Sequence, residues 1–326
     1  MAAELRPVRL LLAEAAGQVD RLDAEVLLAD QLGIERLAML ATPDRLADAA
    51  AFRLRLERRR RGEPVAYITG RREFWSLDLL VSPDVLIPRP DSETLIELAR
   101  SICRARPPAT ILDLGTGSGA LLLAALTVFP QARGVGVDRS PAAVAVALGN
   151  ARRTGLASRA RFVVGHWGEA LGQRFDLILA NPPYVADGEA LPADVGAFEP
   201  ASALFAGPDG LASFRQILPD LPRLLAAGGT ALVEHGAAQQ PAVAALAARA
   251  GLVARGHRDL AGRPRALELA PAPEAPIGPA PEAPIAPAPE APIAPAPEAS
   301  MAPAPEAPIA PAPEAPRGLG KPPRGR

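Results

Sequence analysis

Short apolar runs alternate with helix-like segments along residues 110–269. Within the runs, apolar side chains follow one another directly, as in buried strands, whereas the segments between them have apolar residues at helical spacing. The predicted strands are 110–114, 133–138, 161–165, 175–180, 230–234, 252–257 and 265–269. This alternation predicts an α/β fold with a mainly parallel sheet covered on both faces. Ligands of such sheets bind beyond the carboxyl ends of the strands, so polar residues there are the candidates for chemistry.

The first 62 residues have helical spacing only. Apolar residues recur three or four positions apart in 4–17 and 20–32, and strong helix formers surround them in 47–61. Asp20 is the expected N-cap of the second helix. Residues 1–62 are therefore predicted to form a small helical domain, and none of its side chains indicates catalysis.

Residues 63–90 combine β-prone side chains with glycine and proline. The stretches 65–68, 74–75 and 77–81 are rich in β-branched, aromatic and aliphatic residues. They predict a β-hairpin that links two domains.

A helix start and a proline-rich tail delimit the rest of the chain. Asp91 or Ser92 is the expected cap of a helix, and residues 91–270 are predicted to form the sheet domain. Residues 271–326 hold 19 of the 38 prolines and repeat an eight-residue Pro-Ala-Pro-Glu-Ala-Pro-Ile-Ala unit. Because proline cannot donate to a helix or a sheet, this tail is predicted to be disordered and extended. It has no expected enzymatic role, and as a spacer or ligand its partner is unknown.

Charge and cysteine content narrow the class of protein. The formal net charge of −1 divides into −2 for residues 271–326 and +1 for residues 1–270, so neither part resembles a polyelectrolyte and nucleic acid is an unfavoured partner. Arginine is spread through the chain, and the run Arg58-Arg59-Arg60-Arg61 is expected to be a solvated helix end. Cys103 is the single cysteine, which favours a reducing, cytoplasmic location. No segment predicts a membrane span, and no metal site is predicted.

A glycine-rich turn follows the first strand of the sheet domain: Asp113-Leu114-Gly115-Thr116-Gly117-Ser118-Gly119-Ala120. Glycines let a ligand approach the backbone, and the helix that follows offers free N–H groups. The spacing also satisfies the dinucleotide fingerprint, so a nicotinamide enzyme stays open at this point. Asp138 ends the next strand, from which a carboxylate can reach ribose hydroxyls; its alternative role is to cap the helix near Ser140.

Asn181-Pro182-Pro183-Tyr184 follows the predicted strand 175–180. The asparagine offers an acceptor and two donors, the prolines stiffen the segment, and the tyrosine supplies a flat wall. These groups suit a planar –NH₂ group, which amino-methyltransferases must hold and nicotinamide enzymes need not. Together with the glycine turn and Asp138, they predict a methyltransferase that binds S-adenosylmethionine.

The chain resembles the protein-(glutamine-N5) methyltransferases that modify the Gly-Gly-Gln glutamine of peptide-chain release factors. The resemblance covers about residues 5–269 and rests on segments 62–70, 85–93, 113–120, 181–184, 198–200, 209–211 and 259–263. It implies a seven-stranded class I methyltransferase, Rossmann-like sheet behind a helical substrate-binding domain. It also implies S-adenosylmethionine as cofactor and release factors as partners.

The resemblance assigns roles to individual residues. It implies contact with the methionine part of the cofactor for Gly115, Thr116, Gly117, Ser118 and Gly119, and places Asp138 at the ribose and Trp167 near the adenine. Asn181, Pro182, Pro183 and Tyr184 would hold the substrate amide, with Asn181, Pro182 and Tyr184 as catalytic residues and Asn181 also beside the cofactor. His166 departs from the family, which usually has an acidic residue there. A neutral histidine offers one ring acceptor in place of a carboxylate.

Two alternatives remain open on the sequence. The same four-residue segment suits an exocyclic amino group of a nucleic-acid base, although such a substrate needs base flipping and a basic groove. A non-catalytic, cofactor-binding scaffold could instead act through its proline-rich tail. Retention of all four residues at 181–184 favours an enzyme.

Overall fold

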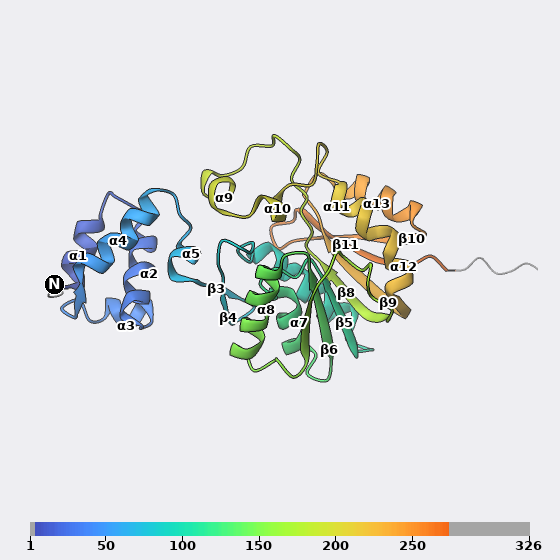
Figure 1. Ribbon diagram of the computed structural model, residues 1–326, viewed down its shortest axis with the longest axis horizontal. Helices are drawn as coiled ribbons and strands as arrows, with labels where there is room; N and C mark the ends of the chain where they lie inside the picture. The colour runs from blue at the N-terminus through green and yellow to red at the C-terminus, as the bar shows by residue number, and fades with distance from the viewer. Residues whose placement is uncertain (1–3, 274–326) are drawn as a thin grey trace, which may run out of the picture. The chain divides into compact units, whose positions relative to one another are not determined.

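A seven-stranded sheet lies at the centre of the part that the computed structural model describes, residues 4–273 (Figure 1). The strands lie in the order β10-β11-β9-β8-β5-β6-β7. Their bounds are β5 Thr110–Leu114, β6 Arg133–Asp138, β7 Ala160–Val164, β8 Phe175–Ala180, β9 Leu225–Glu234, β10 Leu252–Arg258 and β11 Pro264–Pro271. Neighbours among β5 to β9 are parallel, whereas β11 is antiparallel to β9 and β10. The predicted α/β fold with seven strands is confirmed; the tail predicted for 271–326 lies, from residue 274 on, outside the described residues.

Strand β9 extends farthest beyond its predicted bounds. β9 begins at Leu225 rather than at residue 230, and its pairing with β8 shifts register between Phe175 and Leu177. Gly228 has φ +72°, and a Cβ at Gly229 would lie 2.9 Å from the carbonyl oxygen of Phe175. The adjacent glycines therefore let the strand continue through an irregular, crowded stretch. Because this stretch has the sequence pattern of a loop, the strand was predicted to begin after it.

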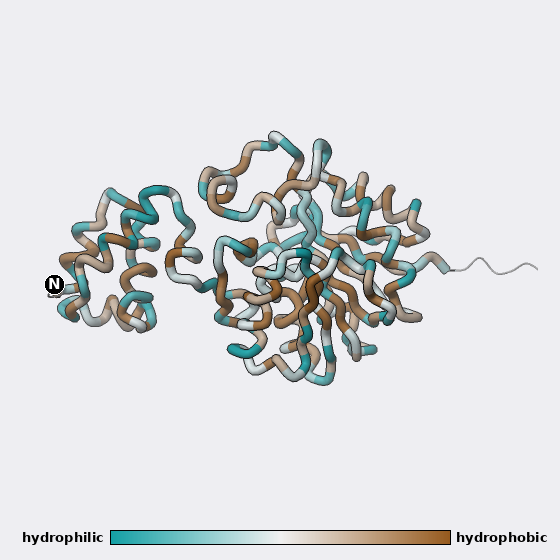
Figure 2. Tube along the Cα trace, viewed as in Figure 1, coloured by the Kyte–Doolittle hydropathy of each residue, from teal (hydrophilic) through white to brown (hydrophobic). Residues whose placement is uncertain are grey.

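Helices cover both faces of the sheet. They are α6 Glu93–Ile102, α7 Ala120–Val128, α8 Pro141–Arg153, α9 Ala193–Phe198, α10 Ala201–Leu204, α11 Ala212–Ile217, α12 Leu221–Leu224 and α13 Gln240–Arg249, with 3₁₀ turns η1 Pro90–Ser92 and η2 Leu218–Asp220. Strand residues alternate between two apolar clusters: Ile111 packs with α6, α7 and α8, whereas Leu112 packs with α11, α12 and α13. Figure 2 shows that hydrophobic residues follow one another along the strands. The period-two alternation of a buried strand thus supplies both cores.

The N-terminal segment contains four helices, α1 Val8–Ala15, α2 Arg21–Leu32, α3 Arg36–Leu40 and α4 Ala49–Arg60. Asp20 accepts a hydrogen bond from the Leu22 N–H at 2.8 Å, which confirms the predicted cap of α2. α3 and the short antiparallel strands β1 Leu5–Pro7 and β2 Leu46–Asp48 were not predicted from the sequence. The strands shorten the expected helices, because Pro7 ends β1 at the position from which α1 begins.

The linker prediction was partly wrong. Residues 65–68 form part of a helix, α5 Val65–Thr69, rather than a strand. Pro64 precedes the first turn and Gly70 closes the helix in the left-handed conformation, so both ends favour a helical turn over a strand. Short apolar runs are ambiguous between the two, and the ends decide here.

The predicted hairpin is present farther along, as β3 Arg71–Phe74 and β4 Leu77–Leu80. Its turn is Trp75-Ser76, both with positive φ. Ser92 occupies the N-cap position of α6 but makes no capping hydrogen bond, and Asp91 pairs with Arg265 at 2.8 Å. The predicted cap position at Ser92 is therefore confirmed, but its side chain makes no capping bond because it contacts Asn181 instead. Within residues 4–273, no helix is long and apolar enough to cross a bilayer.

Asn150 ties the hairpin to the sheet domain. This side chain on α8 is fully buried; it accepts from the Leu80 N–H at 2.7 Å and donates to the carbonyls of Leu80 and Ser118, each at 2.9 Å. Substitution Asn150→Ala would leave these backbone groups unpaired and lower the free energy of unfolding by about 3 kcal/mol. Urea unfolding measures this change. Thr154→Ala, which removes a hydroxyl from the residue that follows α8, should cost less than about 1 kcal/mol, and equal losses would contradict the anchoring role of Asn150.

Candidate active site

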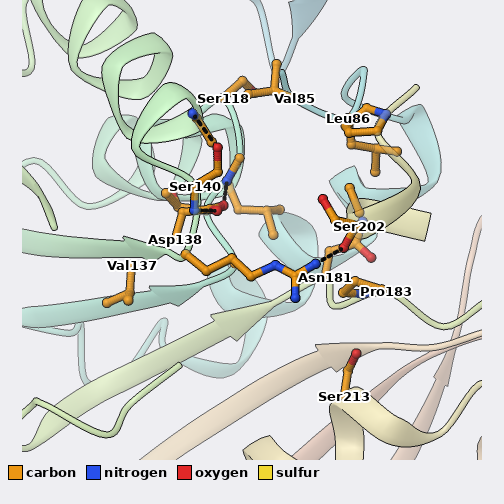
Figure 3. A pocket seen from close by; sticks show the side chains of 18 of the residues that line it. Val85, Leu86, Ser118, Val137, Asp138, Ser140, Asn181, Pro183, Ser202 and Ser213 are labelled. Carbon is orange, nitrogen blue, oxygen red and sulfur yellow. Dashed lines mark hydrogen bonds between the residues drawn. The ribbon is translucent and has the colours of Figure 1, made fainter. Parts of the chain in front are cut away.

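A cavity of about 280 Å³ lies beyond the carboxyl ends of β5, β6 and β8. The glycine turn, Asp138 and Asn181 line it, each from the end of a different strand (Figure 3). Its remaining walls come from the linker, from residues 165–167 after β7, from the first turns of α7 and α8, and from the segment after residue 199. The three segments that the sequence places at strand ends thus meet at one site, as expected for a parallel sheet.

The glycine turn needs its glycines for different reasons. Gly115, Gly117 and Gly119 have φ values of +73°, +53° and +82°, which disfavour any side chain. A Cβ at Gly115 would lie 3.2 Å from the Trp167 ring, whereas a Cβ at Gly117 would meet no atom within 4 Å. Gly117 therefore leaves open space for a ligand beside the backbone. The Thr116 hydroxyl stabilises the turn by donating to the buried Asp113 carboxylate at 2.6 Å.

Asp138 holds two backbone segments together. Its Oδ2 accepts from the Gly117 N–H and its Oδ1 from the Ser140 N–H, each at 2.9 Å. Ser140, not Asp138, is the N-cap of α8 and accepts from the Ala143 N–H. Each carboxylate oxygen keeps a second lone pair, so Asp138 can bridge the turn and still accept from a ligand hydroxyl.

Trp167 and His166 line the cavity beside the turn. Trp167 has φ +47°, a strained conformation for a bulky residue, and its indole N–H donates to Gln216 Oε1 at 2.8 Å. This contact holds the ring against Gly115 as a flat wall. His166 Nδ1 lies 2.7 Å from Glu169 Oε1. When Nδ1 of a neutral ring donates to Glu169, Nε2 is left as an acceptor.

The segment 181–184 is divided between the cavity and the core. Asn181 and Pro183 line the cavity, whereas Pro182 and Tyr184 are not among its lining residues. Asn181 Nδ2 donates to Ser92 Oγ at 2.9 Å, which leaves Oδ1 as the acceptor of the amide. Tyr184 packs against the core on the α13 side of the sheet, with its hydroxyl 3.5 Å from Glu234 Oε1. Burial raises the pKa of Tyr184 to about 12.

Glu199 was named in the sequence motif 198–200 without a role, and the structure gives it one. The side chain is only 5% exposed; Oε2 accepts from the Ile87 N–H at 3.1 Å and Oε1 pairs with Arg89. It joins the linker to the segment after β8, and both line the cavity. An acidic residue between Phe198 and Pro200 is the one signal in the sequence for this buried contact.

Ser92 lines the cavity, whereas Glu234 contacts Tyr184 and does not line it; the sequence indicated neither residue for the site. Glu234 ends β9 and is 1% exposed, and burial raises its pKa to about 7. Ser92 is 4% exposed and contacts Asn181. A charged residue that ends an apolar strand is the only hint of Glu234 that the sequence contains.

Comparisons with known proteins agree with this geometry. Residues 106–257 match a family described as a methyltransferase domain, and residues 5–70 match the PrmC N-terminal domain. A release factor glutamine methyltransferase of Rhodospirillum rubrum is 44% identical over 76% of this chain and 78% of its own length. The enzyme of the same name from Xylella fastidiosa strain Temecula1 is 44% identical over 75% and 90%, respectively.

Among solved structures, a release-factor-specific protein-(glutamine-N5) methyltransferase of Alicyclobacillus acidocaldarius is 28% identical, with a TM-score of 0.36 over 59% of this chain and 99% of that chain. The sequence identities and coverage of the curated relatives carry the assignment. The chain belongs to the release factor glutamine methyltransferase family.

Proposed function

We propose that this chain transfers a methyl group from S-adenosylmethionine to the side-chain amide nitrogen of the Gly-Gly-Gln glutamine in peptide-chain release factors. The observation that carries the proposal is the orientation of Asn181. Its amide donates to Ser92 and keeps Oδ1 for a ligand in the cavity. Family membership then supplies the substrate, and the helical residues 1–62 are the part that we assign to substrate binding.

The cavity suits the cofactor. Space beside Gly117 and the free lone pairs of Asp138 match the methionine part and the ribose, and the flat wall of Trp167 matches an adenine. Thr116 and Ser118 also line the cavity, and Gly119 supports the turn. At His166, the acceptor Nε2 takes the place that an acidic side chain has in the family. When bound, S-adenosylmethionine supplies an electrophilic methyl group on a positively charged sulfur.

The protein must orient a weak nucleophile. An amide nitrogen is delocalised, so Asn181 Oδ1 accepts one amide hydrogen and aims the nitrogen at the methyl carbon. With the cofactor held by the glycine turn and Asp138, the N–C bond would form as the S–C bond breaks, S-adenosylhomocysteine would leave, and the methylated amide would lose its extra proton to solvent. Such orientation and fixed dipoles lower the activation barrier by several kcal/mol. The carbonyl of Pro182 remains our proposed second acceptor. Tyr184 supports the segment from the core side, where its hydroxyl lies 3.5 Å from Glu234 Oε1.

Substitution Asn181→Ala tests the proposed transfer. Removing an acceptor that acts on the reacting group should lower kcat on a release factor by about 10²- to 10³-fold, with little change in cofactor affinity. Labelled cofactor and mass spectrometry of the Gly-Gly-Gln peptide measure the transfer, with Glu97→Gln, an exposed change on α6, as the control. The proposal fails if wild type leaves that glutamine unlabelled, and label on RNA or DNA would favour a nucleic-acid substrate.

Asp138→Asn tests the cofactor site separately. The amide has one acceptor oxygen, so it cannot serve both the Gly117 and Ser140 N–H groups and also a ribose. Affinity for S-adenosylmethionine should fall by about 10- to 100-fold, as expected when a charge-assisted hydrogen bond is lost. Calorimetry with the cofactor alone measures this, again beside Glu97→Gln. Unchanged affinity would remove Asp138 from the proposed site.

A further inference from the structure

Gln239 makes hydrogen bonds to three different connections of the sheet domain. Its Nε2 donates to the carbonyl oxygens of Tyr184 at 2.9 Å and Gly210 at 3.3 Å, and its Oε1 accepts from the Gly236 N–H at 3.0 Å. These partners follow β8, precede α11 and follow β9, respectively. One side chain therefore joins three loops, of which the farthest lies 55 residues away in the chain.

The position of Gln239 leaves its side chain free for these contacts. Gln239 is the N-cap residue of α13, but it makes no capping hydrogen bond. Short side chains such as serine and aspartate cap helices, whereas a glutamine extends farther from the backbone. Only one orientation of its amide satisfies two carbonyl oxygens and one N–H group, because the NH₂ end has the two hydrogens to donate. The three contacts thus fix the side chain as well as the loops.

The contact with Tyr184 restrains the segment 181–184. Among the residues that the structure describes, Gln239 makes the one hydrogen bond to the backbone of the last three residues of this segment. Pro182 and Pro183 have no N–H group and a fixed φ, so this part of the chain is stiff. Fixing the Tyr184 carbonyl therefore also limits where the Asn181 side chain can lie.

The contact with Gly210 extends the restraint to another wall of the cavity. Gly210 has φ +70°, and a Cβ there would lie 2.4 Å from the Tyr184 carbonyl oxygen and 2.7 Å from Gln239 Nε2. A glycine is therefore required for these groups to meet. α11 begins two residues later, and its Gln216 lines the cavity and accepts from the Trp167 indole N–H. Gln239 thus supports the segment 181–184 and α11 together.

We propose that Gln239 is a positioning residue, which fixes the segment 181–184 and the start of α11 relative to each other at the cavity. Without it, the carbonyl groups of Tyr184 and Gly210 lose their donor, and both loops can shift. A displacement of about 1 Å at a reacting group can cost about 10²-fold in rate. The role in methyl transfer rests on the proposed function, whereas the positions of the two loops do not.

Asparagine-selective ¹⁵N labelling of the full chain tests the positions of the loops, because Asn150 and Asn181 are its only asparagines. In Gln239→Ala, the side-chain amide pair of Asn181 should shift, whereas the pair of Asn150, which is buried on α8, should stay at its wild-type position. Gln240→Ala is the matched control and should move neither pair. The amide of this neighbouring glutamine lies beside Gly256 and does not line the cavity.

An Asn181 pair that stays at its wild-type position in Gln239→Ala would overturn the proposal. If the Asn150 pair shifts as well, the substitution has changed the fold more widely. Gln239→Glu then decides in the same way, because it keeps the size of the side chain and removes both donors.

A double-mutant cycle tests the catalytic consequence. Gln239→Ala should lower kcat on the release factor by about 10- to 100-fold with KM near wild type, and Gln239→Glu should do the same. In the Asn181→Ala background, where the substrate amide has lost its acceptor, Gln239→Ala should lower kcat by less than about 3-fold. An undiminished loss in that background, or a KM effect alone, would contradict positioning. If wild type transfers no methyl group, the proposed function fails, and the NMR comparison still decides the role of Gln239.

Discussion

The parallel pairing of β5 with β6 and β8 is the constraint on which the site depends. Because parallel strands end at the same edge, this pairing brings the glycine turn, Asp138 and Asn181 together although they are far apart in the chain. Hydrogen bonds also join these segments. The N–H groups of Gly115 and Thr116 both donate to the Val137 carbonyl at 2.9 Å, and the Asp138 carboxylate accepts from the Gly117 N–H. The side of the cavity that we propose for the cofactor is thus fixed by the sheet.

The side of the cavity that we propose for the substrate depends on contacts between distant segments instead. Glu199 holds Ile87 and Arg89, and Asn181 contacts Ser92. Both contacts join residues 87–92 to the part of the chain after β8. A single short stretch between the helical part and the sheet therefore supports both the wall of the cavity and the orientation of Asn181.

The sequence predicts those features of the fold and the site that depend on the local pattern of residues. Strand ends, the glycine turn and Asn181 could be located because each depends on neighbouring residues, and the bounds of β6 and β8 were predicted without error. Helix α5 could not, because a short apolar run satisfies either structure. The pairs Arg89–Glu199 and Ser92–Asn181 are 110 and 89 residues apart, so no local pattern marks them. Tyr184 was expected at the substrate, but it lies behind the segment because its ring extends the apolar cluster beneath β8 and β9.

Asn181 shows why a directional contact is needed where packing would not suffice. The two ends of a side-chain amide differ little in shape, so packing alone does not distinguish its oxygen from its NH₂ group. In this structure Nδ2 of Asn181 donates to Ser92 Oγ at 2.9 Å, and Ser92 is itself buried. Because an NH₂ group that donates to Ser92 leaves the oxygen on the other side, this contact turns Oδ1 toward the cavity. Directional hydrogen bonding, rather than packing, therefore sets which atom of Asn181 faces the cavity.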